Sequence, residues 1–255
     1  MNKKIIFSLF ASLLLLAQSA NAEIKFGNEK DPSATLSFNA GYNTAYVSRG
    51  VDQNNSSGSP YIGADLNTKI GFYVGTWTAA AGSSANNGAT QEVDIYGGFK
   101  KTFGPLTGDI GYIVYHYPTA NSSLATDYSE GYVKLTLAPD KTPFTVGLSY
   151  YKEDTNGFTT CSGAACSGNA RATVTGIGKS YMEANATYDF GPVQSLVSYG
   201  KYKDITKTTT VTLSKSISDI GFGLSYINAK TESTTNGYAP AKDLDFLVLN
   251  ISKTF

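Results

Sequence analysis

The sequence has 255 residues, and its 20 basic residues balance its 20 acidic ones. Because no basic excess exists to attract phosphates, nucleic acid is excluded as a partner. The chain has 26 Gly, 18 Tyr and 13 Phe but only two Met, a composition that favours β-sheet over helix. A hydrophobic fraction of 41% is ordinary for a soluble protein. A membrane barrel shows a similar average, however, because its strands alternate polar and apolar residues.

The chain begins with a pattern typical of a secretory signal peptide. Lys3 and Lys4 precede an apolar run over residues 5–17, and Ala20-Asn21-Ala22 follows as a small-residue cleavage site. The apolar run is shorter than the roughly 20 residues that a membrane helix needs. The expected organisation is a signal peptide (1–22, cleaved near Ala22), a short periplasmic tail (23–32) and one domain (33–255).

Alternating apolar and polar residues recur along the rest of the chain. In one clear segment, Phe144, Val146 and Leu148 occupy every second position, which places them on one face of a strand. About twelve segments show this pattern over roughly ten residues, the length that a tilted membrane strand requires. The clear segments lie at 36–42, 93–99, 131–137, 144–150 and 220–226, and weaker ones near 60–67, 72–79, 106–117, 179–189, 193–202 and 206–215.

The connections between these segments alternate between short and long. Short connections fall at 67–71, 103–105, 138–142, 190–192 and 216–219, and long ones at 47–58, 80–90, 118–127, 154–178 and 231–241, with one short exception near Asp204. Outer-membrane barrels have short periplasmic turns and long outer loops. We therefore predict an all-β fold, a transmembrane antiparallel β-barrel of about 12 strands with both termini periplasmic. A secreted sandwich, the soluble alternative, would not make every second connection tight.

The last predicted strand ends on an aromatic residue. Phe255 is the final residue, and Leu247, Leu249 and Ile251 precede it at alternate positions. This ending resembles that of bacterial outer-membrane barrels, whose assembly machinery reads an aromatic terminus. The resemblance implies the Gram-negative outer membrane as the location, with outer-membrane lipid, the barrel assembly machinery and periplasmic chaperones as partners. Lys253 shares the apolar face, where a lysine at the rim can reach headgroups or water.

Five short motifs follow one another through the first half of the predicted domain. The first is Tyr46-Val47-Ser48-Arg49-Gly50-Val51-Asp52-Gln53, and the others lie at 71–77, 92–98, 115–118 and 130–132. The first resembles the Tyr-x-x-Arg-Gly-x-x-Gln signature of the TorF-like porin family, and the others match that family in the same order. The resemblance implies an outer-membrane channel. In that family an acidic residue often precedes the first tyrosine, whereas this chain has Ala45.

Strand parity predicts which side chains face the lumen. If Val93 and Ile95 face lipid, their neighbours face inward. The same parity turns nine charged or phenolic side chains inward: Asp65, Glu92, Asp94, Tyr96, Lys100, Asp109, Glu130, Lys134 and Glu183. Six acids against two lysines predict a channel for passive diffusion of small hydrophilic solutes with a mild preference for cations. The alternative is a sealed structural or adhesive barrel acting through its outer loops, in which these acids pair with Lys100, Lys134 and Arg49.

Arg49 is one of two arginines and lies where the first strand enters its loop. Its guanidinium can fork onto Glu92 or Asp94 and fix the loop over the lumen, or it can bind an anionic solute. The acids within the protein favour the first role. The aromatic residues show no regular series along the lumen of the kind that a sugar-binding slide needs.

The remaining residues with reactive side chains indicate neither catalysis nor a metal site. Cys161 and Cys166 are expected to form a local disulfide in an oxidising envelope. Two thiols without a nearby histidine cannot complete a zinc site, so neither metal nor cofactor is expected. The only histidine, His116, leaves a lipid-facing hydrolase as a third alternative. The serine of such enzymes, two residues further along, is replaced here by Pro118.

Overall fold

The computed structural model describes residues 23–82, 88–118, 120, 127–154, 179–232 and 242–255. The expected signal peptide (1–22) and the expected disulfide between Cys161 and Cys166 lie outside the described residues. Within the described ranges, no helix is long and apolar enough to cross a membrane.

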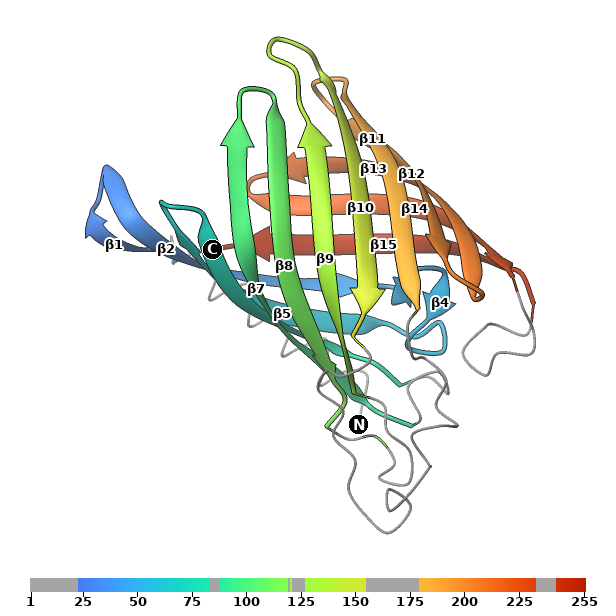
Figure 1. Cartoon of the computed structure of the whole chain (residues 1–255). Helices are drawn as coiled ribbons and strands as arrows, with labels where there is room; N and C mark the ends of the chain where they lie inside the picture. The colour runs from blue at the N-terminus through green and yellow to red at the C-terminus, as the bar shows by residue number, and fades with distance from the viewer. Residues whose placement is uncertain (1–22, 83–87, 119, 121–126, 155–178, 233–241) are drawn as a thin grey trace.

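Twelve long strands form one closed antiparallel β-barrel (Figure 1). They are β2 (Asp31–Asn43), β5 (Ser59–Thr68), β6 (Phe72–Ala80), β7 (Gln91–Phe103), β8 (Leu106–His116), β9 (Tyr128–Leu137), β10 (Phe144–Glu153), β11 (Ser180–Asp189), β12 (Gln194–Tyr202), β13 (Thr206–Ile217), β14 (Ile220–Thr231) and β15 (Leu244–Thr254). Each pairs with the next long strand along the chain. The pairing of Ile251 with Tyr42 joins β15 to β2 and closes the barrel. The structure thus confirms the predicted all-β barrel of twelve strands.

The first strand, β1 (Ile24–Asn28), lies beside the barrel rather than within its wall. It folds back on the start of β2, and its pairing runs from Ile24 with Leu36 to Asn28 with Asp31. The residues expected to form a tail, 23–32, therefore contain a strand, and β2 begins at Asp31.

The end of the chain lies on the same edge of β2. Phe255 exchanges two backbone hydrogen bonds with Phe38, of 2.7 and 3.0 Å. The terminal aromatic residue therefore extends the pairing of β15 with β2 by one step and takes part in closing the barrel.

The two ends of the barrel differ in the length of their connections, as predicted. At the end that we call the turn end, tight turns join β5 to β6, β7 to β8, β9 to β10, β11 to β12 and β13 to β14. In the turn Ser218-Asp219 both residues have positive φ, 48° and 64°, which suits the twist of the flanking strands. The opposite end, the loop end, carries the longer connections, apart from 203–205 between β12 and β13.

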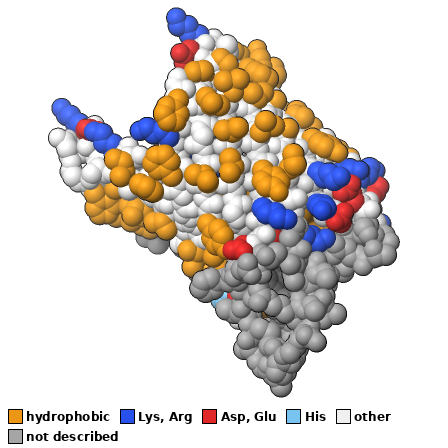
Figure 2. All heavy atoms as spheres, viewed as in Figure 1, with side chains coloured by type: hydrophobic (Ala, Val, Ile, Leu, Met, Phe, Trp, Pro, Cys, Tyr) orange, Lys and Arg blue, Asp and Glu red, His pale blue; other side chains and the backbone are white. Residues whose placement is uncertain are grey.

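Apolar side chains cover the outside of the barrel, whereas charged side chains are buried inside it. Leu148 and Leu247 point outward and are 60% and 68% exposed. Figure 2 shows such hydrophobic side chains spread over the wall of the barrel on the side in view. Glu130, in contrast, is fully buried. A barrel surrounded by lipid requires this inverted arrangement.

Candidate functional site

A short hairpin between β2 and β5 enters the barrel at the loop end. It consists of β3 (Val47–Ser48) and β4 (Val51–Asp52), joined by Arg49 and Gly50. Both turn residues have positive φ, 51° and 81°, as the two-residue turn of a hairpin requires. At Gly50 a β-carbon would also collide with side chains of β13 and β14. Glycine at position 50 therefore permits both the positive φ of the turn and the close packing of the hairpin tip against the barrel wall.

The β3–β4 hairpin (residues 47–52) lies in the lumen and contacts β9, β13 and β15 of the wall. At its base, Ala45 packs against Phe246 and Val248 of β15. At its tip, the Thr206 hydroxyl of β13 donates a hydrogen bond of 2.5 Å to the Arg49 carbonyl oxygen. The hairpin is therefore held at both ends and narrows the barrel at the loop end.

The Arg49 side chain forms a buried ion pair with Glu130 of β9. Nη1 and Nη2 donate to the two carboxylate oxygens, each over 2.6 Å. The Arg49 side chain is 11% exposed and that of Glu130 is 1% exposed. Two parallel charge-assisted hydrogen bonds give this pair both strength and a fixed geometry. The predicted partners Glu92 and Asp94 were wrong, because the hairpin reaches further across the barrel than its place in the sequence indicates.

Aromatic rings enclose the same guanidinium. Its Cζ atom lies 4.7 Å from the ring centres of Tyr151 and Tyr181 and 5.3 Å from that of Tyr202, within the range of cation–π attraction. The Tyr115 hydroxyl accepts a longer hydrogen bond of 3.4 Å from Nη2. We call Glu130 and these four tyrosines the Arg49 cage.

Three of the four tyrosines of the cage belong to an arc that the sequence analysis missed. Tyr132, Tyr151, Tyr181 and Tyr202 are direct cross-strand neighbours on β9 to β12. Successive ring centres are 5.4, 6.2 and 6.2 Å apart. The arc runs around the barrel rather than along it, so only the pairing register of four strands could have revealed it.

A second contact of the loop lies at Tyr46, just before the hairpin. Its hydroxyl donates to Glu92 over 3.1 Å, and its ring meets Trp77 edge-on with centres 5.6 Å apart. Burial raises the pKa of Tyr46 well above its ordinary value, and the charge of Glu92 raises it further. The phenol therefore stays protonated and remains a hydrogen-bond donor.

A cavity of about 790 Å³ lies in the lumen beside the hairpin. Seven of the nine side chains predicted to face inward line it: Asp65, Asp94, Tyr96, Lys100, Asp109, Lys134 and Glu183. The other two, Glu92 and Glu130, are buried, at 3% and 0% exposure. Arg49 also lines the cavity, so the hairpin forms part of its boundary.

The carboxylates of this cavity bond to tyrosines rather than to lysines. Tyr96 donates to Asp65 and Tyr73 donates to Asp109, each over 2.6 Å, while Tyr181 donates to Glu183 over 2.7 Å. Among the described residues, no ion pair within 4.0 Å includes Lys100 or Lys134. The sealed-barrel alternative paired the inward acids with Lys100, Lys134 and Arg49. The ion pair of Arg49 with Glu130 confirms the last of these pairings. The pairing with the two lysines was wrong, because phenols lie close enough to satisfy the carboxylates first.

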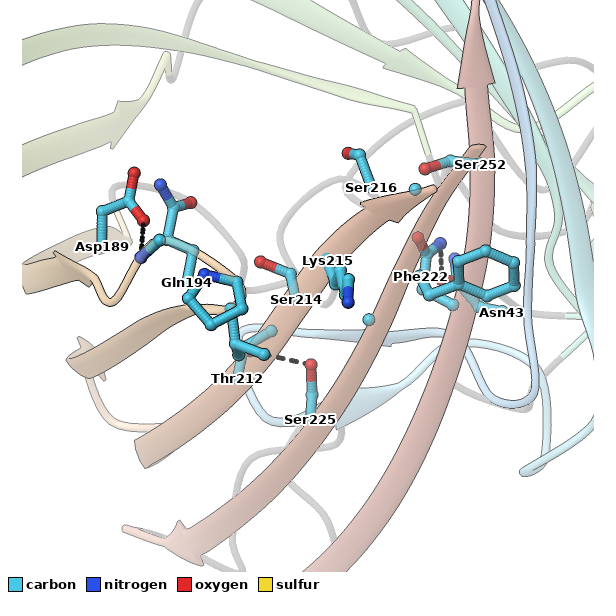
Figure 3. Close-up of a pocket in the computed structure, with 16 residues that line it drawn as sticks. Asn43, Asp189, Gln194, Thr212, Ser214, Lys215, Ser216, Phe222, Ser225 and Ser252 are labelled. Atoms are coloured by element: carbon cyan, nitrogen blue, oxygen red, sulfur yellow. Dashed lines mark hydrogen bonds between the residues drawn. The ribbon is translucent and has the colours of Figure 1, made fainter. Parts of the chain in front are cut away.

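The wall formed by β12 to β15 is different in character. A cavity of about 680 Å³ at this wall is lined mainly by hydroxyl and amide side chains (Figure 3). Thr212 and Ser225 bond across β13 and β14 at 2.8 Å, and Asn250 donates to Asn43 over 2.8 Å. The sequence analysis named no site residue here, although alternate Thr and Ser over residues 206–216 were a usable signal. The lumen thus has one acidic, tyrosine-rich wall and one largely uncharged wall.

His116 lies at the loop end of β8. Its Nδ1 is 2.5 Å from the Asp127 carboxylate, which also accepts a hydrogen bond of 2.9 Å from the Tyr117 backbone amide. These contacts hold the start of β9 to the end of β8, which is a structural role for the histidine.

Solved outer-membrane porins have a fold similar to this closed twelve-stranded barrel. The KdgM porin, also solved in complex with disordered oligogalacturonate, gives a TM-score of 0.52 at 9% identity over 87% of this chain and 99% of its own. The NanC porin gives 0.48 at 12% identity, over 86% and 98%. OpdK from Pseudomonas aeruginosa gives 0.46 at 14%, over 88% and 67%. At these identities the likeness shows the fold alone.

The sequence itself matches one family model. Residues 28–255 match the family described as "Bacterial protein of unknown function (Gcw_chp)". The chain therefore belongs to that family, and the match covers the whole barrel. No curated protein sequence matches the chain.

Proposed function

We propose that this protein is an outer-membrane channel through which small hydrophilic solutes diffuse passively, with a mild preference for cations. The observation that carries the proposal is the cavity in the lumen, which is lined by the carboxylates Asp65, Asp109 and Glu183 and by the buried acid Asp94, against Lys100 and Lys134. Arg49 adds no free positive charge, because Glu130 neutralises it. Fixed carboxylates in a narrow lumen attract cations and replace part of their hydration.

The charge of the lumen also bears on the class of solute. The KdgM porin was solved with an oligogalacturonate, which is a polyanion. An excess of carboxylates would repel such a ligand, so the solutes proposed here are neutral or cationic. The hydroxyl and amide wall at Thr212, Ser225 and Asn250 offers hydrogen bonds without charge and suits the polar groups of such solutes.

The proposed setting is the outer membrane of a Gram-negative cell, with the turn end and both termini in the periplasm. It is supported by the apolar outer surface, the alternation of turns and loops, and the predicted signal peptide. Phe255, which pairs with Phe38, would be the residue that the barrel assembly machinery reads. Within this proposal, the resemblance of residues 46–53 to the TorF-like porins reflects a shared channel function.

Liposome swelling and planar bilayers test the proposal. Vesicles that contain the refolded protein should swell in small neutral or cationic solutes, and the reversal potential in a KCl gradient should have the sign of cation preference. A clear preference for anions would refute the charge argument.

A sealed barrel that acts through its outer loops is the second candidate, and the β3–β4 hairpin favours it. The hairpin lies in the lumen and is tied to β9 and β13 through Arg49. Arg49→Ala separates the two candidates. If wild-type protein is closed but the variant conducts, the barrel is a gated channel, whereas the absence of conduction from both would support the sealed barrel.

A further inference from the structure

The Arg49 cage has the composition of a ligand site, although the chain itself fills it. A carboxylate forks onto the guanidinium over two bonds of 2.6 Å, and three rings lie within 5.3 Å of its Cζ atom. Paired hydrogen bonds to a carboxylate together with aromatic faces select a planar, delocalised cation. An ammonium group of equal charge lacks the two parallel donors that the fork requires.

Part of the cage faces the lumen, whereas Glu130 and Tyr202 do not line the cavity while Arg49 is in place. Arg49, Tyr115, Tyr151 and Tyr181 all line the cavity of about 790 Å³, together with the carboxylates Asp65, Asp109 and Glu183. A cation in this cavity would be concentrated by these carboxylates and would lie next to the cage.

We propose that the Arg49 cage is a binding site for the guanidinium group of a solute, that Arg49 occupies it in the resting protein, and that a guanidinium-bearing solute exchanges with Arg49 and frees the β3–β4 hairpin. This inference rests on the proposed channel function and names the class of solute that opens it. The exchange changes the binding free energy at the cage little, because the incoming guanidinium makes the same two hydrogen bonds and ring contacts that Arg49 gives up.

The tether sets the concentration at which exchange occurs. A group held by its own chain competes as though it were present at about millimolar concentration or more, so exchange requires solute in that range. The tip of the hairpin also lies against side chains of β13 and β14 at Gly50 and accepts the bond from Thr206, whereas the Arg49 side chain is the contact that ties it to β9. Loss of the Arg49 side-chain contacts therefore releases the hairpin from β9.

Single-channel recording with methylguanidinium chloride tests the exchange, at about 1–100 mM to bracket the effective concentration of the tethered Arg49. Wild-type current should rise and saturate. Methylammonium, a cation without the fork, and N-methylurea, a neutral analogue of the same shape, should have no such effect at matched ionic strength. In Arg49→Ala methylguanidinium should lower the current instead of raising it. The current of this variant is already high, and the solute fills the cage that the missing side chain leaves empty.

Two cage variants test the assignment of the site. Glu130→Gln should abolish the rise in current that methylguanidinium causes in protein with Arg49 and the fall that it causes in Arg49→Ala, because the carboxylate that forms the fork loses its charge. Tyr151→Leu should leave the midpoint of the exchange with Arg49 unchanged, because both guanidinium groups lose the same ring contact. Combined with Arg49→Ala, it should shift the midpoint about fivefold upward, since only the solute then loses that cation–π contact. Equal responses to methylguanidinium and methylammonium, or unchanged responses in Glu130→Gln, would overturn the proposal.

Trp77 allows a measurement that does not depend on conduction. It is the only tryptophan of the chain, and Tyr46, next to the hairpin, packs against it. Its emission in detergent-refolded protein should change saturably with methylguanidinium and not with N-methylurea. If no variant conducts but Trp77 responds in this way, the channel function fails and the guanidinium site stands. If Arg49→Ala conducts and neither current nor emission responds, only the site fails.

Discussion

Arg49 and Glu130 are 81 positions apart in the sequence and meet inside the barrel through two hydrogen bonds of 2.6 Å. Arg49 comes from the β3–β4 hairpin and Glu130 from β9, so this pair ties the hairpin to a strand of the barrel wall. Because the hairpin lies inside the barrel, its position limits the width of the lumen at the loop end. In the proposed channel, this ion pair is therefore the contact on which the open or closed state depends.

A double-mutant cycle should find strong coupling between Arg49 and Glu130. Arg49→Ala leaves a buried carboxylate without its cation, which should lower the free energy of unfolding by about 3–5 kcal/mol. Glu130→Ala should cost a similar amount, and the double variant should cost less than the sum by about 1–3 kcal/mol. Urea unfolding of protein refolded in lipid vesicles measures these values.

The control for this cycle is the pair Lys69–Asp31, whose side chains are 59% and 66% exposed. Its coupling energy should stay below about 1 kcal/mol, as is usual for surface ion pairs. Additive effects of the Arg49 and Glu130 substitutions would show that the buried pair does not hold the hairpin.

Neutralising one partner at a time should shift ion selectivity in opposite directions. Arg49→Gln leaves the negative charge of Glu130 in the constriction and should increase the preference for cations. Glu130→Gln leaves the positive charge of Arg49 there and should move the preference toward anions. Permeability ratios from reversal potentials measure both changes. Shifts of the same sign in the two variants would contradict the placement of this pair at the constriction.

Gly50→Ala should displace the hairpin, and Gly88→Ala provides a matched control. The two glycines have nearly the same φ, 81° and 78°, so alanine costs about 1–2 kcal/mol of backbone strain at either position. At Gly50 the new β-carbon would meet the barrel wall, whereas at Gly88 none of the residues that the structure describes lies within 4 Å of it. Conductance should therefore rise in Gly50→Ala alone, and equal conductance in the two variants would argue against close contact of the hairpin tip.

An ion cluster at the loop end should make stability depend on pH. Lys201 and Lys207 are direct cross-strand neighbours, and Glu232 lies 3.3 and 2.8 Å from their ammonium groups. The hydrogen bond from Lys207 lowers the pKa of Glu232 below its ordinary value. The contribution of Glu232 to the free energy of unfolding is therefore fully present above the ordinary carboxyl pKa, and it is lost as the pH falls through the lowered pKa.

Glu232→Gln tests this dependence on pH. The variant should unfold at a lower temperature than wild type at neutral pH. This difference should disappear once the pH is below the lowered pKa of Glu232, where the wild-type carboxyl is also protonated. The difference should be below about 1 kcal/mol because the cluster is exposed to solvent. A difference that persists at low pH would point to packing rather than charge.

The strands and their connections were predictable because their determinants are local. A lipid-facing position must be apolar whatever the rest of the barrel does, so the alternation at Phe144, Val146 and Leu148 is visible in the sequence. The same parity identified the side chains that the structure places inside, such as Asp65 and Asp109. The lengths of turns and loops completed the topology.

The arrangement within the lumen was not predictable, because it depends on how far a loop reaches and on the register of distant strands. Nothing near Arg49 in the sequence indicates that it passes Glu92 and Asp94 and reaches Glu130. Lys134 likewise lies over the ring of Tyr132 instead of pairing with an acid. In both cases the outcome was decided by tyrosines that only the cross-strand register brings together.

The reversal potential of refolded wild-type protein and of Arg49→Ala in a KCl gradient tests the central claim most directly. If the protein is a cation-preferring channel that widens when the ion pair of Arg49 with Glu130 is lost, the potential should be cation-selective in both proteins. The conductance should be larger in the variant. Asp65→Asn combined with Asp109→Asn should reduce that selectivity, whereas Asp31→Asn, outside the cavity, should not. An anion-selective potential, or no conductance from either wild type or Arg49→Ala, would contradict the account.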